Sequence, residues 1–431
     1  MKTRGCSGAF WLLLVLAGLF LGSGGCLSPP TPTALPSPSP SSPPPSPVPA
    51  PGIGLTVWHT WDSEEEALYR RILSDYRRQH PEVVVHLRRV PVGEVLAEYE
   101  AAVLEGEGPD LLVGWSHWLA PLTERQVVMP LEGLLEQDFW ASFYPFALEG
   151  VRAQGHLYAV PYACETVALY YNRDFVLEPP TSTVALLDLA ATWPGQEQAG
   201  LAYPLSFYNT VGYLYAFGGR LLDEEGRPAL DTLEMRAWLQ WLQTVRASPG
   251  VIATESYGQA DTLFKSGVVA MVVNGSWVLP DYLQALGSER LGVAPLPMLG
   301  ETRVWPSPLV GYRVLLVNPI RLAAHPQATL DLLRFLSGPQ VQGERLAQLG
   351  AVPTWSGLDL SSWPLQAAFV RQAELGRPRP LDRRKEALWD PMENLLYNVV
   401  ERRMPLEQAL QETREKVDQV LEQLRAAGAG P

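Results

Sequence analysis

The chain lacks the short motifs that carry most catalytic and metal chemistry. It has only three cysteines in 431 residues, and no two of them stand at metal-ligand spacing. It has no glycine-rich phosphate loop, no His-Glu-x-x-His and no Gly-x-Ser-x-Gly elbow. The six histidines are scattered along the chain: His59, His80, His86, His117, His156 and His325. These absences count against most enzyme classes and against a resident metal or cofactor.

Positive charge is also scarce. Lys and Arg total 33 against 46 Asp and Glu, which gives a formal net charge of -13. Nucleic-acid binding depends on clustered basic residues, so a nucleic-acid partner is excluded on this balance. The hydrophobic fraction of 47% and the charged fraction of 18% are those of a globular protein, and the length is sufficient for two domains.

The N-terminus is typical of a secretion signal. Lys2 and Arg4 precede an apolar run at residues 9–21, which is too short to span a membrane, and small residues follow at 22–25. The ending at Cys26 resembles a bacterial lipoprotein cleavage box, although Ser23 stands where that box usually has Leu. The resemblance implies a signal peptide at 1–25 and a lipidated Cys26 that anchors the protein outside the cytoplasm, at the cell surface or in the periplasm. Cleavage by a standard signal peptidase is the alternative.

Residues 26–52 form a segment rich in Pro and Ser. From Ser28 to Pro51 it carries no charge, which favours extended polyproline II over packing. Such a segment reaches about 70 Å at about 3.1 Å per residue. We interpret it as a tether that holds a folded domain away from the membrane.

The body then alternates strand and helix patterns. Apolar strands are expected at 53–58, 83–87 and 111–113, with amphipathic helices from Ser63 and at 94–104. This order is typical of a parallel sheet covered by helices, which binds ligands at the carboxyl ends of its strands. A second region of the same kind has strands at 167–171 and 268–273 and a helix at 235–245. The sequence therefore predicts two α/β lobes.

The last forty residues are mostly helical in pattern. One stripe of that pattern repeats at helical spacing, and we expect it to dock on the body and not on a partner helix. Its members are Leu406, Leu410, Thr413, Val417, Val420 and Leu424.

Tryptophan is abundant, with 14 in the chain. Several fall where strands should end: Trp58, Trp61, Trp115, Trp118 and Trp277. Flat aromatic rings suit the apolar faces of sugars, and neighbouring carboxylates accept hydrogen bonds from sugar hydroxyls. Asp62, Glu165 and Tyr208 are candidates for such contacts. Core packing is the alternative for any single Trp, helix capping for Asp62, and a hinge ion pair for Glu165.

The order of several motifs resembles the extracellular solute-binding proteins of carbohydrate ABC importers, within them the maltose/maltodextrin-binding group. The pattern Gly-x-x-Pro-Asp stands at 106–110, and the most distinctive segment is Glu165-Thr-Val-Ala-Leu-Tyr-Tyr-Asn-Arg-Asp174. Further matching segments lie at 155–161, 217–219, 264–267, 274–277, 293–297 and 350–353.

The resemblance implies a two-lobe periplasmic-binding-protein-like fold of class II type, each lobe a mainly parallel sheet flanked by helices. Chain crossings near Cys164 and at 293–297 would divide it into a first lobe at 53–163 and 293–355 and a second at 164–292 and 356–431. It also implies a monomeric receptor, not an enzyme, that closes on an oligosaccharide and delivers it to a membrane-embedded ABC permease.

The resemblance further implies a set of ligand-binding residues. Asp62 and Glu165 take the places of sugar-binding carboxylates, and Tyr208 and Trp277 those of stacking residues. The full set that we expect to contact ligand is Asp62, Glu165, Tyr208, Trp277, Trp115, Trp61 and Tyr397.

The site departs from the family pattern at several positions. Trp-x-x-Asp-Arg becomes Trp115-Ser-His117-Trp118 after Gly114, a glutamate becomes Ser206, and Leu396 beside Tyr397 replaces a late stacking Trp. These changes leave two other functions open. One is a secreted carbohydrate-active hydrolase that uses Asp62 and Glu165. The other is an ABC receptor for a non-sugar ligand such as a phosphodiester or polyamine.

Overall fold

The computed structural model describes residues 52–193, 198–254, 256–381, 383–402 and 404–426. The signal peptide, Cys26 and all of the tether except Gly52 lie outside the described residues. Within that described part, no helix has the length and apolar character needed to cross a membrane.

The first sheet has the strand order β13-β12-β3-β1-β2, and β6 pairs with β12. Parallel pairing joins β1 to β2 and β3, as the βαβ pattern predicts. Strand β12, from a later part of the chain, pairs antiparallel with β3 and β6. The strands are β1 (Ile53–His59), β2 (Val83–Arg89), β3 (Leu111–Trp115), β6 (Val160–Glu165), β12 (Leu309–Val317) and β13 (Arg377–Pro378).

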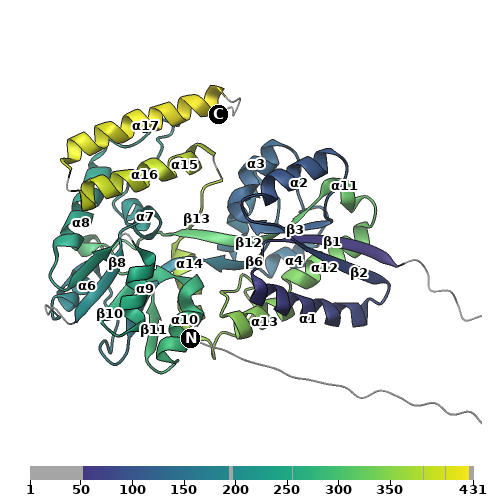
Figure 1. Ribbon diagram of the computed structural model, residues 1–431, viewed down its shortest axis with the longest axis horizontal. Coiled ribbons are helices and arrows are strands. Elements are labelled where there is room, and N and C mark those ends of the chain that lie inside the picture. Colours follow the sequence, from purple (N-terminus) through teal and green to yellow (C-terminus); the bar gives the residue numbers. More distant parts are fainter. Residues whose placement is uncertain (1–51, 194–197, 255, 382, 403, 427–431) are drawn as a thin grey trace, which may run out of the picture. The chain divides into compact units, whose positions relative to one another are not determined.

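The second sheet has the order β11-β7-β10-β8-β9. Strands β8, β9 and β10 pair in parallel, and β7 pairs antiparallel with β10 and β11. Figure 1 shows these strands and helices α6 to α9 gathered apart from β1, β2, β3, α1 and α2. The strands are β7 (Val167–Asn172), β8 (Ala199–Pro204), β9 (Val251–Thr254), β10 (Val269–Gly275) and β11 (Leu291–Ala294).

Two of the chain segments that pass between the sheets run directly from strand to strand. Only Thr166 separates β6 of the first sheet from β7 of the second, and residues 295–308 separate β11 from β12. A short antiparallel ribbon, β4 (Arg152–Ala153) with β5 (His156–Leu157), lies outside both sheets.

Helices begin and end where local chemistry dictates. Helix α1 (Ser63–Gln79) starts after the N-cap Asp62 and carries Glu64, Glu65 and Glu66 in its first turn, where carboxylates interact favourably with the helix dipole. Besides α1, the longer helices that come before β7 or shortly after β12 are α2 (Val95–Leu104), α3 (Leu119–Glu124), α12 (Pro326–Ser337) and α13 (Pro339–Leu349). Smaller ones are α4 (Gln137–Ala141), α5 (Pro145–Glu149) and α11 (Pro319–Leu322).

The helices between β7 and β12 are α6 (Thr183–Ala190), α7 (Phe207–Ala216), α8 (Leu233–Ala247), α9 (Tyr257–Lys265) and α10 (Leu279–Leu286). Those near the C-terminus are α14 (Pro364–Leu375), α15 (Arg383–Ala387), α16 (Trp389–Leu396) and α17 (Leu406–Ala426). A π-helical turn, Tyr397–Glu401, follows α16 directly.

The C-terminal helix docks on the body, as the apolar stripe predicts. Leu410, Thr413 and Val417 are buried, and α17 lies against α16 (Figure 1). The buried stripe also includes Ala409 and Leu421, whereas Val420 and Leu424 remain partly exposed.

Candidate functional site

A cleft of about 370 Å³ is lined by side chains from both lobes. Asp62 follows β1, Glu165 ends β6, and Ser276 and Trp277 follow β10. Carboxyl ends of strands are where open α/β sheets bind ligands. The structure thus brings three of the predicted site residues, Asp62, Glu165 and Trp277, to one cleft.

Asp62 is an N-cap and a cleft residue at once. Its Oδ1 accepts hydrogen bonds from the backbone N–H groups of Glu64 at 2.9 Å and Glu65 at 2.8 Å. These two bonds fix the carboxylate at the start of α1, where it is exposed to the cleft. The cap and a ligand role are compatible, because both bonds use the same oxygen.

Glu165 stands at the point where the chain leaves the first sheet. Its backbone is paired with Gly311 of β12, and its side chain is only partly exposed. The pKa of its carboxyl is raised to about 6, chiefly by burial. The guanidinium groups of Arg313 and Arg345 oppose this shift, and the charge of Glu65 adds to it.

Trp277 presents an aromatic face to solvent. It is 43% exposed, although most large apolar side chains of the second lobe are buried. Its ring packs over Gly275, where an added Cβ would lie 2.2 Å from ring carbons, so the position requires glycine. Tyr208 of α7 lies beside it, with ring centroids 5.8 Å apart.

A third aromatic joins this pair, and sequence analysis missed it. Trp389, the first residue of α16, has its ring centroid 6.0 Å from that of Tyr208. Leu396, which stands where the family pattern has a late stacking Trp, is 2% exposed in the core. Tyr397, which we expect to contact ligand, lies outside this cleft and lines a second pocket.

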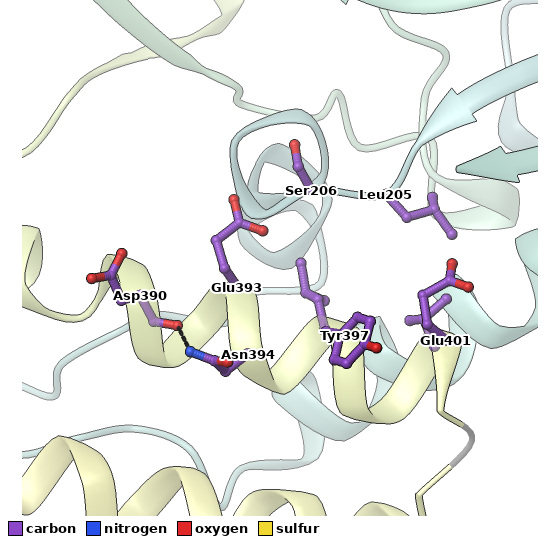
Figure 2. Close-up of a pocket in the computed structure, with 9 residues that line it drawn as sticks. Leu205, Ser206, Asp390, Glu393, Asn394, Tyr397 and Glu401 are labelled. Carbon is purple, nitrogen blue, oxygen red and sulfur yellow. Dashed lines mark hydrogen bonds between the residues drawn. The ribbon is translucent and has the colours of Figure 1, made fainter. Parts of the chain in front are cut away.

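That second pocket, of about 430 Å³, lies between α16, its π-helical continuation and the start of α7 (Figure 2). Tyr397 is 43% exposed, and the pocket is also lined by Ser206, Asp390, Asn394 and Glu401. Glu393 accepts a hydrogen bond from the backbone N–H of Phe207 at 3.0 Å, and burial raises the pKa of its carboxyl. The residues of this pocket come from the second lobe alone.

Trp61 does not reach the cleft surface. It is 0% exposed, stacked on Tyr69 with centroids 3.7 Å apart and on His59 at 4.4 Å, and its Nε1 donates to the hydroxyl of Tyr162. Its expected contact with ligand is therefore corrected to core packing. The ring fills the space between α1 and the sheet, which is the structural alternative for a strand-end Trp.

Trp115, at the end of β3, lies under a buried arginine. The guanidinium of Arg313 stacks over its ring at 4.5 Å. Trp115 is partly exposed but is not among the side chains that line the cleft. Burial lowers the pKa of the nearby His117 to about 3, so this imidazole is neutral at physiological pH.

Arg313 and Arg345 are cleft residues that sequence analysis did not identify. Both reach the carboxylate of Glu65, Arg313 at 2.9 Å and Arg345 at 3.1 Å. Arg313 could have been identified from the sequence, because it is a charged residue within the otherwise apolar strand 309–317. Arg345 could not, since an arginine on an amphipathic helix is ordinary.

The described residues include no group of three or more His, Cys, Asp or Glu side chains that could hold a metal ion. The cleft instead offers ring faces, carboxylates and hydroxyls. Two α/β lobes, joined by crossing strands and lining one cleft together, define the class of two-lobe solute-binding proteins.

The chain belongs to the bacterial extracellular solute-binding protein family, whose model matches residues 72–369. A maltotriose-binding protein of Pyrococcus abyssi is 25% identical over 361 residues, which are 80% of this chain and 77% of that protein. A maltooligosaccharide ABC transporter solute-binding lipoprotein of Streptococcus pneumoniae serotype 4 is 24% identical, over 58% of this chain and 62% of that protein.

The structure is similar to that of a maltose/maltodextrin-binding domain from Bdellovibrio bacteriovorus bound to maltotriose. The TM-score is 0.69 at 25% sequence identity, and the match covers 86% of this chain and all of that one. The fold predicted from the sequence, two α/β lobes of the periplasmic-binding-protein type, is confirmed.

Proposed function

We propose that this protein captures an oligosaccharide outside the cytoplasm and delivers it to an ABC permease. The observation that carries the proposal is the exposed ring of Trp277 beside Tyr208, at a cleft that also contains Asp62 and Glu165. Pyranose rings have apolar faces for aromatic contact and hydroxyl edges for carboxylates. Trp389 extends the aromatic surface beyond Tyr208.

Capture would proceed by closure of the lobes. We assign residues 53–163 and 293–355 to the first lobe and 164–292 and 356–431 to the second, although β13 of the last range pairs with β12 of the first sheet. A ligand that contacts Asp62 of the first lobe and Trp277 of the second favours the state in which both contacts form. The crossings at Thr166 and at residues 295–308 are the segments that would absorb such a hinge motion.

The partners follow from the relatives and from the N-terminus. The pneumococcal relative is a lipoprotein of an ABC transporter, which supports a membrane permease as recipient and a lipid anchor at Cys26. We further propose that the protein acts as a monomer, at the cell surface or in the periplasm, and returns its ligand chemically unchanged.

One observation also fits a hydrolase. A carboxyl with its pKa raised to about 6, such as Glu165, is suited to act as a general acid, and Asp62 lines the same cleft. The relatives reported above are binding proteins, and we favour binding. Incubation with labelled maltooligosaccharides separates the two, because a receptor returns the sugar uncleaved.

The direct test is titration of the purified protein with maltotriose and longer maltooligosaccharides while tryptophan fluorescence is followed. Binding should change the emission of Trp277 and raise the melting temperature, as any ligand of the native state does. Native mass spectrometry of the protein as isolated would detect a ligand that co-purifies with it. A ligand other than a sugar, such as a polyamine, would overturn the proposal that the protein binds an oligosaccharide.

A further inference from the structure

The charges that line the cleft are unequal in number. Two lining residues carry guanidinium groups, Arg313 and Arg345. Five carry carboxylates: Asp62, Glu64, Glu65, Glu165 and Asp281.

The two arginines are occupied by one carboxylate. Arg313 Nη2 lies 2.9 Å from Glu65 Oε2, and Arg345 Nη1 lies 3.1 Å from Glu65 Oε1. Each guanidinium also stacks on an aromatic ring, and the two residues are 9% and 4% exposed. Glu65 thus pairs with both positive charges in the wall of the cleft, and little of either arginine is exposed to an anionic ligand.

The other four carboxylates have no ion pair among the described residues. Asp62 and Glu64 are exposed at the start of α1, and Asp281 is exposed in the first turn of α10, on the opposite lobe. Glu165 lies at the chain crossing, where burial raises the pKa of its carboxyl to about 6. Above that pH the cleft carries negative charge contributed by both lobes.

A polar group without a partner adds an independent indication of a ligand. Ser276 lines the cleft beside Trp277 and is 6% exposed, and its hydroxyl makes no hydrogen bond to another described residue. Buried hydroxyls are normally paired, because an unpaired one costs free energy. A ligand N–H or O–H group donated to Ser276 would satisfy this oxygen.

Resting on the function proposed above, we propose that the cleft selects its oligosaccharide by charge: it favours a sugar that bears a protonated amine over its neutral counterpart and rejects an acidic one. An ammonium group on the sugar is attracted by Asp62, Glu165 and Asp281 together. A uronate at the same place would meet the same carboxylates, while both arginines are already paired with Glu65. The ring stacking on Trp277 serves all three sugars equally.

The test uses three matched probes: maltotriose, maltotriose with an amine in place of one primary hydroxyl, and maltotriose oxidised to a carboxylate at the same carbon. Calorimetric titration of the purified protein at pH 7.5 and low salt measures each Kd. We expect the amine to bind at least ~10-fold more tightly than maltotriose, which corresponds to about 1.4 kcal/mol, and the acid at least ~10-fold more weakly. Raising the salt to about 0.5 M should shrink both differences, since exposed charges are screened.

Asp281→Asn should lower the ratio of the maltotriose Kd to the amine Kd by several-fold. Glu415→Gln, on the outer face of α17, removes the same charge far from the cleft and should leave that ratio unchanged. If maltotriose binds but all three probes have the same Kd at low salt, charge selection is wrong and the proposed function stands. If none of the three binds, the proposed function fails and this inference fails with it.

Discussion

The hydroxyl of Tyr208 lies 3.5 Å from the backbone carbonyl oxygen of Glu165. It lies 3.3 Å from that of Leu309, the first residue of β12. Tyr208 therefore contacts two of the points where the chain passes between the sheets, while its ring lies beside Trp277. The ring that packs beside Trp277 is thus held against two crossing segments, so that movement of these segments would shift the Tyr208 ring.

Replacing Trp277 with Ala should weaken binding of maltotriose by about 10- to 100-fold, because exposed aromatic anchors at the centre of a site lose about 1–3 kcal/mol on truncation. Calorimetric titration measures the change. Leu233→Ala is the control, since Leu233 is a large apolar side chain, 81% exposed, outside the cleft. Equal affinity of the wild type and Trp277→Ala for maltotriose would show that the Trp277 ring does not contact the ligand.

Replacing Glu65 with Gln should lower the free energy of unfolding by about 3–5 kcal/mol, because two buried guanidinium groups lose their counter-charge. Chemical denaturation followed by circular dichroism measures the loss. Glu98→Gln breaks the exposed pair with Arg88, whose side chains are 41% and 48% exposed, and should cost less than about 1 kcal/mol. A similar small loss of unfolding free energy for both variants would contradict the role of Glu65 as the counter-charge of the two buried arginines.

Glu165 should make the protein less stable as the pH rises through 6. Its pKa is raised from 4.5 to about 6 on folding, so between these values the folded state binds more protons than the unfolded state. The free energy of unfolding therefore falls with rising pH in this window, by up to about 2 kcal/mol. Below pH 4.5 this contribution is constant.

The measurement is urea denaturation at several pH values for the wild type and Glu165→Gln. The difference between the two should grow from pH 4.5 to pH 7 in favour of the variant, which has no charge to bury. A difference that is independent of pH would show that the Glu165 carboxyl titrates alike in the folded and unfolded states.

Replacing Leu410 with Ala should destabilise the second lobe by about 2–5 kcal/mol, because it opens a cavity under α17. Leu410 is 2% exposed. Thermal unfolding measures the loss, and Glu415→Gln on the outer face of the same helix is the control. An unchanged melting temperature would show that α17 is not needed to cover the core.

Much of the fold was accessible to sequence reasoning because the signals are local. Helix α1 follows from the capping residue Asp62, the acidic first turn and the apolar spacing, and β10 follows from a run of apolar residues. The pairing of β12 with β3 and β6 was not accessible, since these strands lie more than one hundred residues apart and each reads only as apolar. The match of motif order to a family supplied only the expectation that residues 293–355 return to the first lobe.

The residues of the candidate site were likewise only partly predictable from the sequence. Trp61 and Trp277 both follow a predicted strand, yet one is 0% and the other 43% exposed. No rule of composition separates them, because burial depends on whether another element covers the ring. For Trp61 that element is α1, through Tyr69.

The sequence by itself determined the class of this protein: two α/β lobes, an N-terminal segment typical of export, and carboxylates and aromatics at strand ends. These depend on periodicity and residue type, which neighbouring residues express. Only the tertiary structure decided that Trp389 joins Tyr208 and that Glu65 engages both Arg313 and Arg345. Those contacts join residues far apart in the chain, and the balance of charge in the cleft exists only once folding has brought them together.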